Sequence, residues 1–211
     1  MYILGLTGSV GMGKSTAAED FRHCGVSVYD ADASVHSLIG PGGCAVEAVG
    51  EAFPGVIKGR AVDRRALGAQ VFSDKMALAR LEAILHPLAN ASRLGFLRQA
   101  AKRRAKLVAL DVPLLFEVGA DKMCDGVAVV TAPKYLQKLR VLSRPGMTEE
   151  RFDQILKNQI LDAEKRSRAD FIIQTSLGRK FSLICIKNII TFVRDRSSYR
   201  SITRNLWVAN G

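Results

Sequence analysis

Apolar and polar positions divide the chain into short apolar runs and longer segments with helical spacing. Five apolar runs are short enough to be buried strands. They lie at residues 2–6, 25–29, 107–110, 126–131 and 170–173. Helical segments follow four of these runs, at 17–21, 33–39, 134–143 and 179–193. Strands that alternate with helices are typical of the α/β class, in which helices cover both faces of a parallel sheet and make three layers.

The middle of the chain interrupts this alternation. Between residues 33 and 106, further segments have helical spacing and no convincing strand separates them. These segments lie at 45–53, 63–72, 73–85 and 88–104. We expect Asp63 and Ser73 to cap two of the helices. His86 and Pro87 should break the pattern, since proline disfavours helix at the residue before it. A helical insertion in an α/β core is therefore predicted, and His86 is either a turn histidine or part of a site.

A glycine-rich loop joins the first predicted strand to the first helix. Residues 8–16 read G-S-V-G-M-G-K-S-T and fit the pattern G-x-x-x-x-G-K-[ST]. Glycines let backbone N–H groups surround phosphate oxygens, and the following helix directs its positive end to the same place. Lys14 adds a mobile charge, and the Ser15 hydroxyl suits Mg²⁺. The alternative is a glycine-rich turn that binds nothing, but chance rarely places this pattern between a strand and a helix.

Carboxylates follow two other predicted strands. Asp30-Ala31-Asp32 closes the second strand and Asp111 closes the third. Ligands of open α/β sheets bind at the carboxyl ends of the strands, which favours a functional role for these side chains. Asp32 could instead cap the next helix, and Asp111 could be an ordinary aspartate at the sheet edge. Beside a phosphate loop, Asp111 has the position of a carboxylate that binds Mg²⁺ or its water shell.

The segment 144–168 is polar, helical in spacing and rich in both charge signs. Elements that carry arginines to a transferring phosphoryl group are often mobile, so we interpret this segment as part of a lid; the alternative is a solvated helical hairpin. The expected divisions are a nucleotide-binding core at 1–32, 107–140 and 169–193, a helical region at 33–106, a lid at 141–168 and a basic tail at 194–211.

The charge is strongly basic, at +11 over 211 residues. Nucleic acid, a membrane surface or a small polyanion could bind such a chain. Twelve Lys or Arg against three acidic residues lie at 58–106. A solvated helical face or a site for a phosphorylated substrate would explain this surplus. Only 7% of the residues are aromatic, so the chain lacks the stacking platforms that nucleic-acid binding uses.

Targeting and redox signals are lacking in the sequence. No run of 18 apolar residues occurs, and the first strand carries the glycine loop, so it is not a removable signal. The four cysteines have no spacing typical of a disulfide framework or a zinc site. We therefore expect a cytoplasmic protein that is not bound to a membrane.

As a set, these motifs resemble the dephospho-coenzyme A kinase family over about residues 1–178. The motifs are the glycine loop, D-A-D at 30–32 with His36, L-E at 81–82 before H-P at 86–87, D-V-P-L-L-F-E at 111–117, Gln137 with Arg140 and Arg144, Gln159, and A-D at 169–170. Many nucleotide enzymes share the glycine loop. The D-V-P-L-L-F-E run combined with D-A-D and H-P is much more specific. The family has a phosphate-loop kinase core, a helical acceptor-binding region and a lid.

The resemblance implies an enzyme that uses ATP and Mg²⁺ to phosphorylate the ribose 3′-hydroxyl of dephospho-coenzyme A, the last step of coenzyme A synthesis. The implied catalytic residues are Asp32, which would act on the hydroxyl, Lys14 and Arg140. The residues implied to bind ATP are Gly8, Val10, Gly11, Met12, Gly13, Lys14, Ser15, Thr16 and Arg144. Those implied at the acceptor are Asp32, His36, His86, Leu114, Phe116 and Glu117. Ser15 and Asp111 are the expected metal ligands.

The region 33–106 would then bind the acceptor, whose diphosphate accounts for the basic surplus. No nucleic-acid or membrane partner is expected, and the protein should be a monomer or a weak homo-oligomer. Two places depart from the family. Met12 stands where a small residue is common, and we expect its side chain to point outward. Residues 174–178 differ from the family's Asn or Asp followed by Gly, so no adenine contacts are assigned there. The tail 194–211 matches no pattern.

Three other functions were weighed. Another small-molecule or nucleoside monophosphate kinase of the same fold would need a different acceptor site, and the D-V-P-L-L-F-E run argues against it. A regulatory GTPase would carry an N-K-x-D guanine motif, which the chain lacks. A basic NTP-binding protein associated with nucleic acid rests on the charge alone.

Overall fold

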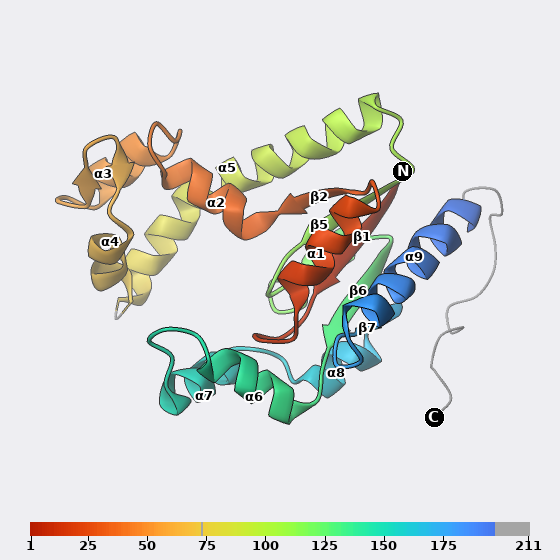
Figure 1. Ribbon diagram of the computed structural model, residues 1–211. Helices are drawn as coiled ribbons and strands as arrows, with labels where there is room; N and C mark the ends of the chain where they lie inside the picture. The colour runs from red at the N-terminus through yellow and green to blue at the C-terminus, as the bar shows by residue number, and fades with distance from the viewer. Residues whose placement is uncertain (73, 197–211) are drawn as a thin grey trace. The chain divides into compact units, whose positions relative to one another are not determined.

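A parallel sheet lies at the centre of the computed structural model, which describes residues 1–72 and 74–196 (Figure 1). Its strand order is β2-β5-β1-β6-β7. The strands are β1 (Tyr2–Thr7), β2 (Ser27–Asp30), β5 (Leu107–Asp111), β6 (Gly126–Thr131) and β7 (Phe171–Gln174). The helices are α1 (Lys14–His23), α2 (Ala31–Ile39), α3 (Val46–Ala52), α4 (Arg64–Val71), α5 (Lys75–Lys102), α6 (Lys134–Leu142), α7 (Glu149–Lys157), α8 (Asp162–Ser167) and α9 (Arg179–Arg196), with a 3₁₀ turn at Ala120–Met123. The predicted α/β class is confirmed.

The register of the sheet brings the carboxyl ends of its strands to one edge. In β1, Leu6 is opposite Asp111 of β5, and Thr7 is opposite Val129 of β6. Thr131, at the end of β6, is opposite Gln174 of β7. All of these pairings are parallel, so the loops that follow β1, β5, β6 and β7 leave the sheet on the same side.

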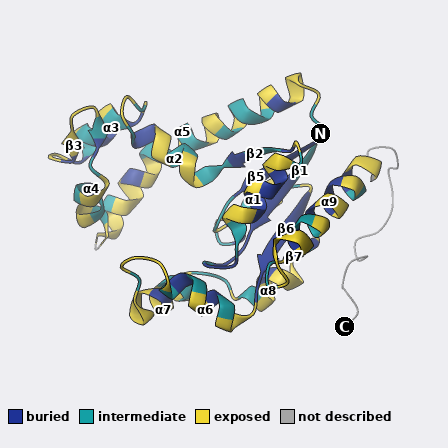
Figure 2. Ribbon diagram, in the orientation of Figure 1, coloured by how far each residue is buried: buried dark blue, intermediate teal, exposed yellow. Residues whose placement is uncertain are grey.

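Alternating strand residues supply two apolar clusters. Leu4, Leu6, Ala128 and Val130 pack with Phe21 and other residues of α1 and α9 on one face of the sheet. Neighbouring strand positions such as Val127 and Val129 pack with Leu115 and Phe116 in a separate cluster. This alternation with a period of two is what a strand buried on both faces requires. Figure 2 shows the strands as the most continuously buried part of the chain.

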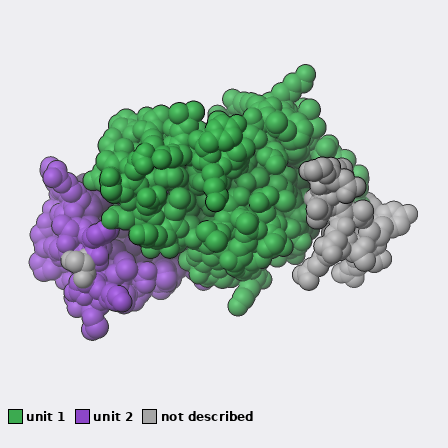
Figure 3. All heavy atoms as spheres, turned by 90° about the horizontal axis from the view of Figure 1, so that it is seen from below, with its two compact units in different colours: residues 1–28, 100–211 green, residues 29–99 purple. Residues whose placement is uncertain are grey.

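The chain divides into two compact units, coloured separately in Figure 3. Unit 1 comprises Met1–Val28 and the described residues from Ala100 onward, and unit 2 comprises Tyr29–Gln99. Unit 2 has a core of its own, which includes Val49, Phe53 and Leu67. It contains most of the predicted helical insertion.

Two expectations for the insertion are wrong. A short antiparallel hairpin, β3 (Ile57–Lys58) with β4 (Ala61–Val62), lies where no strand was expected. The predicted break at His86 and Pro87 is absent, because α5 continues through Pro87. Ile84, Leu85, Leu88 and Ala89 pack against the unit 2 core on both sides of the proline. This burial outweighs the loss of one helical hydrogen bond.

The predicted helix caps have mixed outcomes. Asp63 caps α4, as expected, by accepting hydrogen bonds from the N–H groups of Arg65 and Ala66. Ser73 lies outside the described residues. The cap of α2 is Asp30, which accepts from the N–H of Ala33, so the alternative role of Asp32 as a cap is wrong.

Membrane, cysteine and tail features complete the fold. Within residues 1–72 and 74–196, no helix is long and apolar enough to cross a membrane. The four cysteines form no disulfide. The predicted tail begins inside α9, which extends to Arg196, and residues 197–211 lie outside the described part of the chain.

Candidate active site

The glycine loop adopts a conformation that only glycine accommodates at several positions. Gly11 and Gly13 have φ angles of 76° and 91°, in the left-handed region. A Cβ on Gly11 would lie 2.5 Å from Cγ2 of Val141, and one on Gly8 would lie 2.6 Å from the carbonyl oxygen of Val130. The loop therefore packs closely against β6 and α6, and it leads into α1 at Lys14.

Side chains from later elements hydrogen-bond the outside of this loop. Gln137 of α6 donates to the carbonyl of Val10 at 2.9 Å, and the side-chain oxygen of Gln159 accepts from the N–H of Val10 at 3.1 Å. The hydroxyl of Thr175, just after β7, donates to the carbonyl of Met12 at 2.7 Å. The loop is thus braced by three segments that lie far from it in the sequence.

Met12 points inward, which makes the expectation of an outward side chain wrong. It is 1% exposed, and its sulfur accepts a hydrogen bond from the N–H of Ala132 at 3.1 Å. A flexible thioether can fill an irregular gap behind the loop that a smaller side chain would leave open. Met12 therefore acts on the loop through its backbone and its packing.

Lys14 forms an ion pair with Asp111, which ends β5. The carboxylate is buried, with 4% of the side chain exposed. Ser15 follows Lys14 in the first turn of α1, and its side chain is exposed. The lysine and the carboxylate predicted to act beside the phosphates are thus in direct contact.

The donor atoms at this position fit Mg²⁺. A serine hydroxyl and a carboxylate are hard oxygen ligands, which this ion prefers. Among the described residues, no group of three or more His, Cys, Asp or Glu side chains could enclose a metal. One or two protein oxygens completed by phosphate and water is the usual arrangement for Mg²⁺, and Ser15 with Asp111 would suit it.

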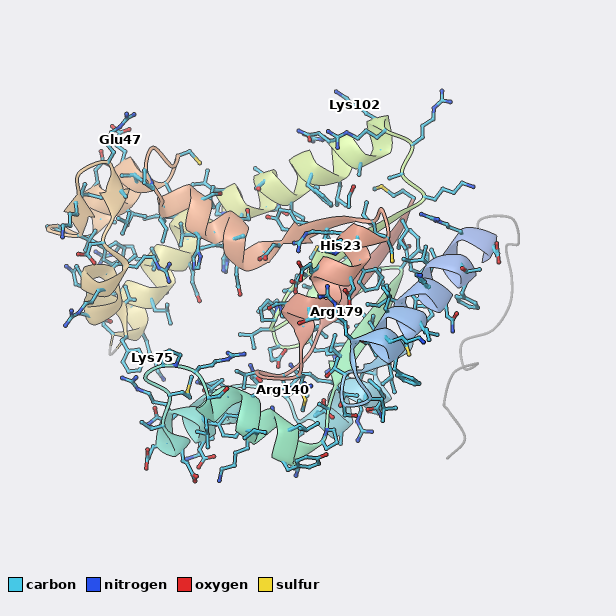
Figure 4. The ribbon with its side chains drawn as sticks, viewed as in Figure 1. His23, Glu47, Lys75, Lys102, Arg140 and Arg179 are labelled. Carbon is cyan, nitrogen blue, oxygen red and sulfur yellow. The ribbon has the colours of Figure 1, made fainter. Side chains whose placement is uncertain are left out.

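Arg140 and Arg144 differ in their surroundings. Arg140, labelled in Figure 4, lies on α6 and donates to the hydroxyl of Thr175 at 3.0 Å and to its carbonyl at 2.9 Å. Arg144 follows the end of α6, and its side chain is exposed. Arg140 is therefore held next to the glycine loop through Thr175, whereas Arg144 is accessible to a ligand.

The D-V-P-L-L-F-E run contains both accessible and engaged side chains. Leu114 is 37% exposed. Phe116 is buried, and the guanidinium of Arg168 lies 4.4 Å from the centre of its ring. Glu117 pairs with the ammonium of Lys165 at 2.7 Å and accepts from the N–H of Ile160 at 2.9 Å. Phe116 and Glu117 thus contact the segment that contains α8.

The ionisation of Glu117 reflects this pairing. Burial raises the pKa of the carboxyl, but the hydrogen bonds from Lys165 and from the N–H of Ile160 outweigh burial, and the pKa lies below its usual value of 4.5. Lys165 itself is fully buried. Glu117 is therefore charged at neutral pH and fixes the start of α8 to unit 1.

The remaining predicted site residues belong to unit 2. Asp32 and His36 are four residues apart on α2, so they share one face of the helix, and both are exposed. His86 is exposed on α5. The hydroxyl of Tyr29 donates to Ser34 at 2.8 Å and contacts the carbonyl of Ala89 at 3.2 Å, which ties the start of α2 to α5.

Sequence reasoning missed the residues that brace the loop. Gln137 and Gln159 were noted as part of a motif without a role, and Thr175 lies in the segment where no contacts were assigned. A polar residue directly after a strand that neighbours the phosphate loop was the available signal for Thr175. Lys165 offered no signal, since a lysine in a polar helical segment is usually exposed.

The comparisons with known proteins agree on one enzyme family. Residues 2–179 match the family model described as dephospho-CoA kinase. A dephospho-CoA kinase of Paramagnetospirillum magneticum is 56% identical over 194 residues, which is 92% of each chain. The crystal structure of TT1252 from Thermus thermophilus has a TM-score of 0.78 at 33% identity, covering 90% of this chain and 96% of that one. A dephospho-CoA kinase from Campylobacter jejuni has a TM-score of 0.62 at 26% identity, covering 91% and 97%.

Proposed function

Because the chain belongs to the dephospho-coenzyme A kinase family, we propose that it transfers the γ-phosphoryl group of ATP to the ribose 3′-hydroxyl of dephospho-coenzyme A. Family membership across most of the chain is the observation that carries this proposal. The braced glycine loop, with Lys14 at its end, supports the donor half of the reaction.

On the donor side, the N–H groups of the loop and the start of α1 bind the phosphates of ATP. Lys14 neutralises negative charge on the transferring group, and its contact with Asp111 keeps the ammonium at the edge of the sheet. Arg140 and Arg144 supply further positive charge from α6 and the segment after it. Mg²⁺, held by Ser15 and Asp111, would reduce the repulsion between the phosphates and an incoming hydroxyl oxygen.

On the acceptor side, Asp32 orients the 3′-hydroxyl. The hydroxyl oxygen forms a bond to the γ-phosphorus while the bond from that phosphorus to the β–γ bridging oxygen breaks. ADP leaves with the electron pair of the broken bond, and the proton of the hydroxyl passes to the carboxylate of Asp32. Because the transition state is loose, positioning contributes more than basicity, and an exposed aspartate suffices. His36, His86, Leu114, Phe116 and Glu117 are the proposed acceptor-side residues.

The decisive experiment is a coupled assay of ADP release by the purified protein with ATP, Mg²⁺ and dephospho-coenzyme A. We expect turnover that requires all three. Turnover of shikimate or a nucleoside monophosphate without turnover of dephospho-coenzyme A would contradict the acceptor and leave a kinase of the same fold.

Replacing Asp32 tests the proton acceptor. Asp32→Asn keeps the size of the side chain and removes its basicity, so kcat should fall by about 10² or more with little change in ATP affinity. Asp195→Asn, at an exposed position near the end of α9, is the matched control and should leave kcat unchanged. Wild-type activity in Asp32→Asn would remove this role from Asp32.

The proposed partners are ATP and dephospho-coenzyme A, without nucleic acid. A monomer or weak homo-oligomer and a cytoplasmic location stay predictions of the sequence. The basic run at 58–106 is mostly in unit 2, where it could bind the diphosphate of the acceptor.

A further inference from the structure

Two carbonyl groups of the glycine loop are held from outside by side-chain donors. The carbonyl of Val10 accepts from Nε2 of Gln137 at 2.9 Å, and the carbonyl of Met12 accepts from Oγ1 of Thr175 at 2.7 Å. Gln137 is only 5% exposed. These carbonyls alternate with the two glycines that have positive φ, Gly11 and Gly13.

The direction of each hydrogen bond is fixed by chemistry. A carbonyl oxygen can only accept, so Gln137 must present its amide nitrogen to Val10. Arg140 donates to Oγ1 of Thr175 at 3.0 Å, which leaves the single hydroxyl hydrogen of Thr175 for the carbonyl of Met12. The carbonyl of Thr131 is a more distant acceptor, at 3.3 Å. Both side chains are therefore donors to the loop.

Holding these carbonyls also orients the next N–H groups. The described residues have no cis peptide bond. In a trans peptide, C=O and N–H point in opposite directions, so the N–H of Gly11 points away from Gln137 and the N–H of Gly13 points away from Thr175. Glycine has no Cβ to restrict its φ and ψ angles, so these peptide units would otherwise rotate at little cost.

The N–H of Val10 is held as well. Oε1 of Gln159 accepts from it at 3.1 Å. Gln159 lies directly before Ile160, whose own N–H donates to Glu117. Two consecutive peptide units, before and after Val10, are thus fixed by separate glutamines.

We propose that Gln137 and Thr175 are positioning residues for phosphoryl transfer. By holding the carbonyls of Val10 and Met12, they direct the N–H groups of Gly11 and Gly13 toward the phosphates of the donor nucleotide. Arg140 supports this by fixing the hydroxyl of Thr175. The inference rests on the proposed use of ATP, and it does not depend on the acceptor.

The test measures nucleotide affinity without acceptor, by calorimetry with Mg-ATP and by competition with adenosine, which has no phosphate. Gln137→Met removes the donor at similar size, and Thr175→Val removes the hydroxyl but keeps the branched shape. Thr175→Ser restores the hydroxyl. Gln154→Met on α7 and Thr191→Val on α9 are matched controls at exposed positions. The melting temperature of each variant is measured without nucleotide.

We expect Gln137→Met and Thr175→Val to weaken ATP binding about tenfold or more, with adenosine affinity unchanged and Thr175→Ser close to wild type. Equal losses for ATP and adenosine, or a lower melting temperature with unchanged ATP affinity, would overturn the proposal in favour of a structural role. Should Thr175→Val fail to fold, Gln137→Met decides by the same criteria. Loss of phosphate affinity in a protein that does not phosphorylate dephospho-coenzyme A would uphold this inference and reject only the acceptor.

Discussion

Among individual residues, ion pairs differ most in what they can contribute. The Glu117–Lys165 pair is almost fully buried, with side chains 14% and 0% exposed, whereas Lys138 and Glu149 pair at 50% and 63% exposure. An exposed pair contributes about 0–1 kcal/mol, because water screens it. Removing one partner of a buried pair leaves a charge without compensation, which costs about 3–5 kcal/mol.

Glu117→Gln should therefore destabilise the protein at neutral pH by about 3 kcal/mol. Because the pKa of Glu117 is lowered in the folded state, its stabilising contribution is complete above its usual pKa of 4.5 and is lost as the pH falls through the lowered value. The difference between variant and wild type should thus shrink below about pH 4.5. Urea denaturation at pH 7 and at lower pH measures it.

Glu149→Gln is the control for this experiment. It removes one charge from an exposed pair, so the free energy of unfolding should change by less than about 1 kcal/mol. A stability difference for Glu117→Gln that is constant with pH would contradict the assignment of a charged, paired Glu117.

Among the elements, α5 shows how packing overrides a local signal. Pro87 lies inside a helix of 28 residues and is exposed. Proline in a helix interior is about 3 kcal/mol less favourable than alanine, because it lacks the N–H and its ring crowds the preceding turn. The apolar residues around Pro87 keep the helix continuous by packing on the core of unit 2.

Pro87→Ala should stabilise the protein, because it restores an N–H donor within α5. Proline also restricts the unfolded chain, which offsets about 1 kcal/mol and leaves a gain of about 2 kcal/mol. For a chain of this size the melting temperature should rise by about 4–8 °C, measured by calorimetry. Ala91→Pro, one turn later at an exposed position, should destabilise by about 3 kcal/mol. A lower melting temperature for Pro87→Ala would show that α5 needs the proline.

At the scale of the whole molecule, the two units have separate cores and separate parts of the proposed chemistry. The glycine loop, Asp111 and the residues that brace the loop all belong to unit 1. Asp32, His36 and His86 belong to unit 2. ATP can therefore stabilise unit 1 through contacts that this unit supplies by itself.

Mg-ATP at about 100 times its Kd should add about 2.7 kcal/mol to the stability of the folded state. This corresponds to a rise of about 5–11 °C in melting temperature. Hydrogen exchange should show added protection at residues 8–14, while amides in the core of unit 2 change little without acceptor. Lys14→Ala should abolish the shift, and Lys187→Ala, exposed on α9, should preserve it. A full shift in Lys14→Ala would contradict the role of the loop.

The sequence by itself determined the features that depend on local pattern. Apolar periodicity predicted the strands of the sheet and the helices between them, because a strand buried on both faces and an amphipathic helix each need their own spacing. The glycine pattern predicted the phosphate loop, because Gly11 and Gly13 adopt backbone angles that other residues avoid. The motif at 111–117 indicated the family, which the comparisons confirmed.

Only the tertiary structure decided which side chains meet. Gln137, Gln159 and Thr175 converge on the glycine loop from segments more than 120 residues away, and no local pattern encodes such contacts. Burial likewise turned Met12 inward, hid Lys165 against Glu117 and carried α5 through Pro87. In each case a gain summed over many contacts outweighed a local preference of a few kcal/mol, and that sum exists only in the folded chain.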